Sequence, residues 1–270
     1  MSVFVNPNCW SVKPRIIGPK IKVSFGQGEI ASLILFLPPD MLPKIIYEDN
    51  HIIVLEKYPG LLSQGDETGH PNLIDIIKNY LKVKYHKPGE VYLGLLQRID
   101  RPVGGLLILA KTSKAFTRLH DQIKARTVDK YYLAISDCRP PKDEDQLIHY
   151  MVKDEKINLS KVYEKEMPGS KDARLNYKLI GSKDGKFLFQ IKLITGRSHQ
   201  IRAQMAHIGC PLLGDVKYGK SLPKPSYELC LYAYKVAITH PVLKERMVWT
   251  HFPNPTGYWK GMDEFFPLLN

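Results

Sequence analysis

The chain has 270 residues, of which 44% are hydrophobic and 24% are charged, the proportions of an ordinary soluble globular protein. Its net charge of +12 predicts attraction to a polyanion, with nucleic acid as the leading candidate; an acidic membrane surface or a merely basic soluble protein are the alternatives. The longest apolar run, residues 30–37, is too short to span a bilayer, and the N-terminus lacks the layout of a signal peptide. We therefore expect a soluble, cytoplasmic protein with no membrane partner.

The spacing of cysteine and histidine residues predicts no metal site. The four cysteines are widely scattered without a C-x-x-C pair, which is typical of a protein from a reducing compartment. His199 and His207 are eight positions apart, but no third ligand lies nearby in the sequence. We therefore expect neither a structural nor a catalytic metal.

The first half of the chain predicts strands and a helix after an uninformative start. Residues 1–42 are punctuated by proline and glycine and predict an extension or an edge hairpin. Residues 45–57 predict two short strands with a turn at Asp49 and Asn50. Pro71 suits the first turn of a helix. Apolar side chains follow it at helical spacing: Leu73, Ile76, Ile77, Tyr80 and Leu81.

The middle of the chain predicts a buried strand followed by a helix. Residues 106–110 are all apolar, and Gly104 and Gly105 before them indicate a backbone that another segment approaches closely. Ser113 is a good N-cap for the helix that follows.

The second half of the chain predicts two more strands and one helix. The strands are residues 128–135 and 187–194, and the polar segment 137–175 between them predicts a hairpin-and-loop insertion. Ser198 can cap a helix whose core face includes Ile201. Strands separated by helices without regular alternation predict a mixed α/β or an α+β sheet.

Two charged segments stand beside predicted core elements. Arg98, Asp100 and Arg101 precede the strand at 106–110, where a solvated turn or a weak surface ion pair is the simpler interpretation. For Arg202, the simpler interpretation is likewise a basic side chain on the surface of a helix, which is the commoner position of an arginine. An arginine among apolar core positions nevertheless normally seeks a buried carboxylate, so both segments are candidate sites.

Five segments resemble, in order, the motifs of the RluA-type pseudouridine synthases. They are Gln97-Arg98-Ile99-Asp100, residues 105–112, Lys130-Tyr131-Tyr132-Leu133-Ala134, Gly196-Arg197-Ser198-His199-Gln200-Ile201-Arg202, and Leu213-Gly214-Asp215 with Tyr218-Gly219. The likeness covers about residues 45–255. It implies an α+β pseudouridine synthase fold, with a mixed, mainly antiparallel central sheet flanked by helices and loops. Residues 43–270 would form this catalytic domain, and no S4-type RNA-binding domain is recognisable in residues 1–42.

The resemblance implies isomerisation of uridine to pseudouridine within ribosomal or transfer RNA. The uridine is flipped out, its N1–C1′ bond breaks and C5 bonds to C1′, so no cofactor or metal is needed. The family's catalytic aspartate corresponds to Asp100, which attacks the sugar or removes a sugar proton to give a glycal-like intermediate. The sequence favours neither route, and a monomer is the default expectation.

The resemblance also implies roles for other residues. Arg202 corresponds to the arginine that pairs with the aspartate, Tyr132 to the tyrosine that stacks on the uracil, and Ile201 to the apolar side of the base pocket. Arg98 corresponds to an arginine near the vacated base or the phosphates. Further phosphate contacts are expected from Arg101, Lys111 and Lys217.

The chain departs from the family pattern at Gln97, Val103 and Gly104, where the family usually has His, Ser or Thr, and Ser. These departures concern substrate fit more than chemistry. The main alternative is a catalytically silent RNA-binding or ribosome-assembly factor on the same fold, which would not need Asp100. A glycosidase with paired carboxylates is disfavoured because no partner acid lies around Asp100.

Overall fold

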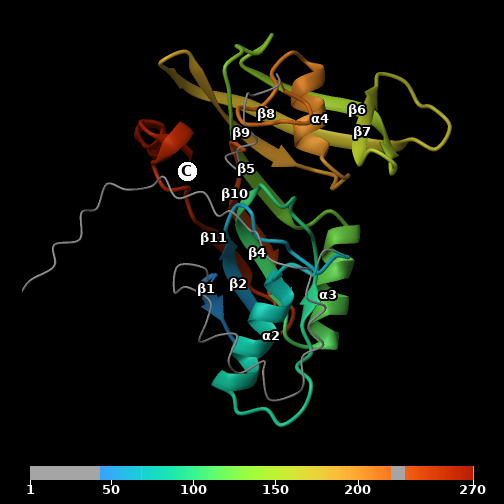
Figure 1. Cartoon of the computed structure of the whole chain (residues 1–270), viewed down its shortest axis with the longest axis vertical. Coiled ribbons are helices and arrows are strands. Elements are labelled where there is room, and N and C mark those ends of the chain that lie inside the picture. Colours follow the sequence, from blue (N-terminus) through green and yellow to red (C-terminus); the bar gives the residue numbers. More distant parts are fainter. Residues whose placement is uncertain (1–42, 68, 220–228, 270) are drawn as a thin grey trace, which may run out of the picture. The chain divides into compact units, whose positions relative to one another are not determined.

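An eleven-stranded mixed sheet forms the centre of the described structure (Figure 1). The computed structural model describes residues 43–67, 69–219 and 229–269, all within one of the two compact units of the chain, Leu37–Asn270. The strands are β1 (Lys44–Glu48), β2 (Ile52–Lys57), β3 (Gly94–Leu95), β4 (Gly104–Ala110), β5 (Asp129–Ser136), β6 (Glu144–Asp154), β7 (Leu159–Tyr163), β8 (Lys171–Lys183), β9 (Lys186–Leu193), β10 (Leu231–Thr239) and β11 (Arg246–Thr250). The helices are α2 (Leu73–Lys84), α3 (Ser113–Lys124) and α4 (Gln200–His207), with short 3-10 segments η2 (Gly257–Trp259) and η3 (Asp263–Leu269).

The sheet is mainly antiparallel. Its strands follow the order β1-β2-β4-β10-β5-β9-β8-β6-β7, while β3 also pairs with β4 and β11 with β10. The pairing of β4 with β10 is parallel, and the other strand pairs of the described residues are antiparallel. The α+β class with a mixed, mainly antiparallel sheet is therefore confirmed.

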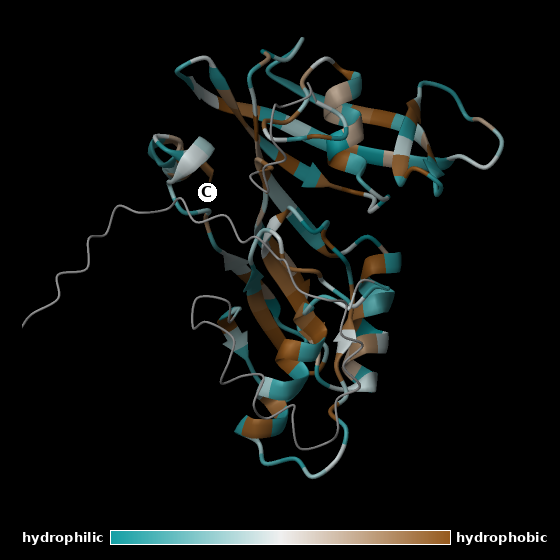
Figure 2. Cartoon of the chain, in the orientation of Figure 1, coloured by the Kyte–Doolittle hydropathy of each residue, from teal (hydrophilic) through white to brown (hydrophobic). Residues whose placement is uncertain are grey.

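Strands β2 and β4 are buried on both faces, because alternate side chains of a strand point in opposite directions. One set belongs to the same core cluster as the apolar face of α2: Ile53, Leu55, Leu107 and Leu109. The other set clusters with Leu119 of α3: Ile52, Val54, Leu106 and Ile108. Helices on both faces account for the uninterrupted apolar runs of these strands, which are brown in Figure 2.

The close approach predicted at Gly104 and Gly105 is made by β10. Gly104 pairs with Tyr232 and Gly105 with Ala233, and a Cβ atom on Gly105 would lie only 2.3 Å from the Ala233 carbonyl oxygen. Gly105 also has a φ of +115°, which favours glycine. The ladder continues from Ala233 to Tyr132 on β5, so Tyr132 lies two strands, roughly 10 Å, from Gly105.

The three predicted helices are confirmed, but their caps differ from expectation. The α2 helix is capped by Asn72, whose side chain accepts a backbone N–H of the first turn. Thr112, and not Ser113, caps α3 in the same way. Ser198 does not cap α4, because the N-cap is His199, whose side chain makes no capping hydrogen bond. At α2 and α3 the cap is the residue whose side-chain oxygen reaches a free amide of the first turn.

The segment 137–175 was predicted as a hairpin-and-loop insertion, and the loop part of that prediction was wrong. Strands β6 and β7 do form a hairpin, but β6 also pairs with β8 and β8 with β9, so the segment extends the central sheet. Alternate residues of β6 are exposed, which gives the segment a polar composition although Leu147, His149 and Met151 are buried.

The predicted N-terminal extension, residues 1–42, lies outside the described residues. In the described ranges, no helix combines the length and apolar character needed to cross a membrane.

Candidate active site

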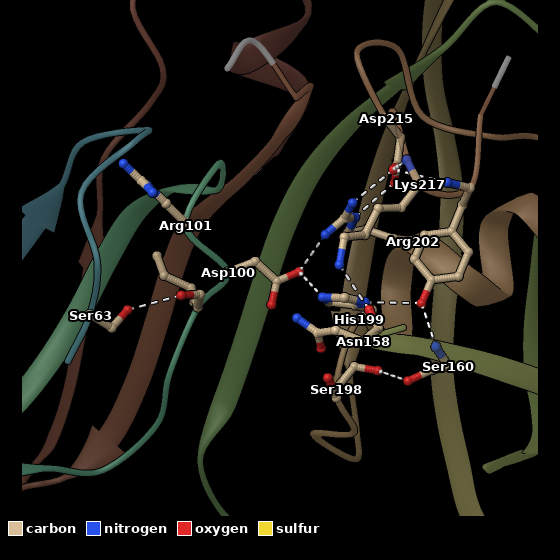
Figure 3. Close-up of polar contacts among 12 residues, drawn as sticks. Ser63, Asp100, Arg101, Asn158, Ser160, Ser198, His199, Arg202, Asp215 and Lys217 are labelled. Carbon is tan, nitrogen blue, oxygen red and sulfur yellow. Dashed lines mark hydrogen bonds and ion pairs between the residues drawn. The ribbon is translucent and has the colours of Figure 1, made fainter. Parts of the chain in front are cut away.

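The loop that carries Asp100 is held at its backbone by a neighbouring loop. The Ser63 hydroxyl donates to the Ile99 carbonyl at 2.9 Å (Figure 3), and the Gly60 amide donates to the Arg101 carbonyl at 2.8 Å. The Arg101 Nε returns a hydrogen bond of 3.0 Å to the Gly60 carbonyl. Because these contacts lie on both sides of Asp100, they position its backbone without engaging its carboxylate.

Lys57 ties the same two loops together from inside the protein. Its side chain is fully buried, and its ammonium donates to the carbonyls of Tyr58, Leu61 and Arg101 at 3.0, 2.7 and 3.1 Å. Burial lowers the pKa of Lys57 to about 7, while the charge of Asp100 opposes this change. The three acceptors match the three N–H groups of the charged form, which makes Lys57 a cross-link between the loops.

Arg202 lies between two carboxylates (Figure 3). Its Nη1 donates to Oδ2 of Asp100 at 2.9 Å, and its Nε and Nη2 bind the two oxygens of Asp215 at 2.8 Å each. The side chains of Arg202 and Asp215 are 4% and 1% exposed, whereas that of Asp100 is 28% exposed. Burial alone would lower the pKa of Arg202, but Asp215 and Asp100 outweigh it and raise that pKa. The pairing with Asp100 is the one that the resemblance implies, and the pairing with Asp215 is additional.

Asp215 has both carboxylate oxygens occupied. Its Oδ1 also accepts the backbone amides of Lys217 at 2.9 Å and Tyr218 at 3.1 Å. Burial alone would raise the pKa of Asp215, but the Arg202 guanidinium and these amides lower it. The turn requires Gly219, since a Cβ there would lie 2.5 Å from the Asp215 carbonyl oxygen. Asp215 is therefore built to hold Arg202 and not to react.

Tyr132 on β5 and Ile201 on α4 are buried residues of the core. They share one core cluster with Ile99 and Val103, which flank Asp100. Burial, and then the negative charge of Asp100, raise the pKa of the Tyr132 phenol, which stays protonated. Its hydroxyl makes no hydrogen bond to the described residues.

Asp100 is the acid whose hydrogen bonds are incomplete. Arg202 binds its Oδ2, and Nε2 of His199 lies 3.7 Å from the same oxygen. Its Oδ1 has no hydrogen bond within the described part of the chain, and the Asp100 side chain is 28% exposed, so this oxygen reaches solvent. A charged, oriented carboxylate with one open oxygen can act as a base or a nucleophile. The nearby phenol of Tyr132 can transfer a proton or stack on a base.

Three of the basic residues predicted to contact RNA lie near Asp100, either in the sequence or in the structure. Arg98 is exposed and makes no hydrogen bond or ion pair within the described ranges. Arg101 is half-buried against the neighbouring loop. Lys217 is exposed, feels the charge of Asp100, and donates to the Asn158 carbonyl at 2.8 Å.

Lys111 is not brought to this group. It follows the far end of β4, which has seven residues, so it lies roughly 20 Å along the strand from the Asp100 loop. Its side chain is 7% exposed, and its ammonium binds Glu48 at 2.7 Å and the Asp49 carbonyl. This environment gives Lys111 a structural role, and we leave it out of the proposed RNA-binding residues.

One group of the described residues brings three potential metal ligands together: His149, Glu164 and His207. Gln204 donates through Nε2 to the Ala173 carbonyl at 3.2 Å, which fixes the orientation of its amide. The same nitrogen lies 2.9 Å from Nδ1 of His149, so Nδ1 accepts a hydrogen bond. The neutral imidazole then carries its proton on Nε2, the nitrogen that faces Glu164. A protonated nitrogen binds no metal, and the group fits a hydrogen-bonded cluster better than a metal site.

The chain is similar in sequence to known proteins. Residues 51–207 match the family described as RNA pseudouridylate synthase. The ribosomal large subunit pseudouridine synthase D of Pasteurella multocida is 30% identical over 282 residues, which cover 96% of this chain and 83% of that protein. The chain belongs to the RNA pseudouridylate synthase family.

Other members of the family are longer than the region they share with this chain. The synthase D of Nitrosomonas europaea is 31% identical over 218 residues, covering 76% of this chain and 60% of that protein. The synthase C of Rickettsia bellii is 32% identical over 201 residues, covering 73% of this chain and 64% of that protein. The chain thus spans less than two thirds of the length of these two relatives.

Solved structures share the fold. The human RNA pseudouridylate synthase domain containing 4 superposes with a TM-score of 0.65 at 21% identity, over 78% of this chain and 88% of that chain. The human RNA pseudouridylate synthase domain containing 1 gives a TM-score of 0.62 at 19% identity, over 81% and 86% of the two chains.

The structure shows the packing around the three residues that depart from the usual RNA pseudouridylate synthase motif. A Cβ atom on Gly104 would lie 3.1 Å from both Pro59 and the Tyr232 ring, so a larger residue requires these neighbours to move. Val103 is 2% exposed within the main core cluster. Gln97 lines a small apolar cavity beside α3. All three residues thus lie in packing contacts, and none of these contacts involves the Asp100 carboxylate.

Four residues of the site received no role in the sequence analysis: Lys57, His199, Asp215 and Tyr218. Three of them lie inside the five segments that carry the family resemblance, and Lys57 begins Lys57-Tyr58-Pro59-Gly60, which also resembles the family. An acid placed between two glycines, as Asp215 is between Gly214 and Gly219, is a signal that could have identified a turn built around a carboxylate.

Proposed function

We propose that this protein is an RNA pseudouridine synthase, which isomerises uridines of ribosomal or transfer RNA. The observation that carries the proposal is the state of Asp100, whose Oδ2 is bound by the buried Arg202 while Oδ1 reaches solvent near the Tyr132 phenol. A net charge of +12 suits an RNA substrate. In this proposal the protein acts as a monomer in the cytoplasm.

The proposed reaction uses the residues of the site in order. The target uridine is extruded from the RNA, and its uracil stacks on Tyr132 with Ile201 on the other side. Asp100 bonds to C1′ as the N1–C1′ bond breaks and is displaced when C5 bonds to C1′; on the other route it removes a sugar proton as that bond breaks and returns it when C5 bonds to C1′. The uracil turns, C5 bonds to C1′, N1 gains a proton and C5 loses one. Because the substrate's own atoms are reused, no cofactor or metal is required.

The remaining charged groups have supporting roles in the proposal. Arg202 keeps the Asp100 carboxylate charged and aimed, and is itself held by Asp215. Arg98, Arg101 and Lys217 contact phosphates around the extruded nucleotide.

Tritium release tests the proposal directly, because C5 of uridine loses its hydrogen only if the isomerisation occurs. We expect the wild-type protein to release tritium from ribosomal or transfer RNA labelled at C5 of uridine, and Asp100→Asn to release none. Asp184→Asn is the matched control: Asp184 is exposed in the β8–β9 turn at a φ of +51°, which asparagine tolerates. This control should retain full activity.

Two results would count against the proposal. Full activity of Asp100→Asn would remove Asp100 from the mechanism. RNA binding by the wild-type protein without pseudouridine in any host RNA would instead favour the catalytically silent RNA-binding factor. Mapping pseudouridines in host RNA with and without the protein would then identify the target or show that there is none.

A further inference from the structure

His199 is held in a conformation that helix capping does not explain. It is the N-cap of α4 with a φ of +53° and a ψ of +22°, yet its side chain makes no capping hydrogen bond. Residues other than glycine rarely adopt this left-handed conformation. The side chain is 8% exposed and points into the site (Figure 3). A residue held in this way beside a reactive group indicates a function for its side chain.

The imidazole connects Asp100 to Tyr218. Its Nδ1 lies 3.0 Å from the Tyr218 hydroxyl, and its Nε2 lies 3.7 Å from Oδ2 of Asp100. The Tyr218 oxygen accepts the Ser160 amide at 2.7 Å, and its hydroxyl proton can be donated to Nδ1. The carboxylate at the other end favours a proton on Nε2. Both neighbours therefore select the same tautomer, with Nδ1 as acceptor and Nε2 protonated.

Burial favours a neutral form of the His199 imidazole. Burial lowers the pKa of His199, and Arg202 and Lys217 lower it further, while Asp100 and Asp215 act in the opposite direction. A neutral N–H directs a donor at Asp100 without adding a second positive charge beside Arg202. The carboxylate thus keeps the negative charge that a base or nucleophile needs.

We propose that His199 is a positioning residue: its Nε2–H, fixed by Tyr218, acts with Arg202 on Oδ2 of Asp100, so that Oδ1 is the oxygen that reacts with the sugar. This inference rests on the proposed pseudouridine synthase function. At 3.7 Å the contact is longer than a hydrogen bond, and it shortens to one when the substrate binds.

Two amide substitutions of different length test this role. The glutamine amide nitrogen occupies about the position of histidine Nε2, whereas asparagine is too short to reach Asp100 but tolerates the left-handed backbone. We expect His199→Asn to lower kcat about 10- to 100-fold with KM changed less than about threefold. His199→Gln should restore most of the lost kcat. His86→Asn is the matched control, because His86 is exposed and also has a positive φ of +47°.

Nitrogen-15 NMR of the full chain, labelled in its nine histidines, reports the tautomer without any RNA. The resonances of His199 are those missing from the His199→Gln spectrum. We expect the wild-type protein to show the neutral Nε2–H form at neutral pH. Tyr218→Phe removes the hydroxyl but keeps a ring beside the Arg202 guanidinium, whose central carbon lies 5.4 Å from the ring centroid. This variant should show a mixture of tautomers.

Three results would overturn the inference: wild-type kcat in His199→Asn, no rescue by a folded His199→Gln, or an Nδ1–H or doubly protonated imidazole at neutral pH. Thermal unfolding establishes that the variants are folded. If His199→Asn does not fold, the tautomers of the wild-type protein and Tyr218→Phe decide. If the wild-type protein makes no pseudouridine, the proposed function fails, and a spectrum with Nδ1–H would separately disprove the arrangement inferred for His199.

Discussion

The two ends of β4 carry charged clusters that differ in how completely their hydrogen bonds are made. At the C-terminal end, both oxygens of Glu48 are occupied by four donors: Lys111, Tyr85, Lys84 and Tyr80. At the N-terminal end, Asp100 has one oxygen bound to Arg202 and the other reaching solvent. Both clusters adjoin the same doubly buried strand. The difference shows that a charged residue beside the core indicates a reactive site only where one of its hydrogen-bond acceptors remains open to a substrate.

The largest effect should come from removing the acid that completes the N-terminal cluster. Asp215→Ala leaves the Arg202 guanidinium buried with only Asp100 as partner, and should lower the free energy of unfolding by about 3 to 5 kcal/mol. Asp100→Ala should lower it by less than about 1 kcal/mol, because Asp100 is partly exposed and Arg202 keeps Asp215. Urea unfolding of both variants measures the contrast. Equal losses would mean that the two acids share one structural role.

Lys57→Met should have the next largest effect. It leaves the Leu61 carbonyl without its donor and removes one of two donors from the Tyr58 and Arg101 carbonyls, which should cost about 1 to 3 kcal/mol in urea unfolding. Because one of these carbonyls belongs to Arg101, kcat should fall as well. Lys84→Met is the control, since the Lys84 side chain is 43% exposed and should contribute less than about 0.5 kcal/mol. A folded Lys57→Met with normal kcat would show that the cross-link does not position Asp100.

Sequence patterns within single segments were sufficient to predict many of the strands and helices. The apolar runs of β2 and β4 and the helical spacing of α2 identify their elements, because these patterns arise within one segment. The parallel contact of β4 with β10 joins segments more than 120 residues apart, and only the glycine pair at 104–105 indicated it. Strand β8 was missed because polar side chains occupy its own exposed positions and interrupt its apolar residues.

Site residues that belong to a sequence motif were predicted, whereas residues whose role depends on a long-range contact were not. Asp100 and Arg202 stand in recognisable segments, and the structure brings them together. Lys57 reaches Arg101 across 44 positions, and Lys111 reaches Glu48 across 63. No property of the lysine itself distinguishes one that cross-links loops from one that neutralises an acid. That distinction depends on which groups the fold brings within hydrogen-bonding distance.

Because the Glu48 carboxylate at the C-terminal end of β4 is fully hydrogen-bonded, its contribution to the free energy of unfolding should depend on pH. Burial alone would raise the pKa of Glu48, but hydrogen bonds from Lys111, Lys84 and Tyr85 lower it from 4.5 to about 2. The folded protein therefore releases this proton more readily than the unfolded chain. The stabilisation is fully present above pH 4.5 and is lost as the pH falls toward 2.

Comparison with Glu48→Gln isolates this contribution. The free energy of unfolding of the wild-type protein should exceed that of the variant by about 2 kcal/mol at pH 6, and the difference should shrink below pH 4.5. Unfolding by urea at several pH values measures both. A difference that stays constant down to pH 2 would show that the Glu48 charge does not account for the stability of this end of β4.

The smallest expected effect is on RNA binding, which should depend on a lysine near the N-terminal end of β4 and not on one at its C-terminal end. Lys217 is exposed beside Asp100, so Lys217→Met should weaken RNA binding a few-fold and reduce the dependence of log K on log salt by about 0.7 to 0.9, the loss of one phosphate contact. Lys111→Met should leave both quantities unchanged, because its ammonium is already bound by Glu48 and the Asp49 carbonyl. Titration of the folded variants with RNA at several salt concentrations measures both slopes. A reduced slope in Lys111→Met would mean that RNA spans the full length of β4, and that the cluster around Glu48 opens when RNA binds.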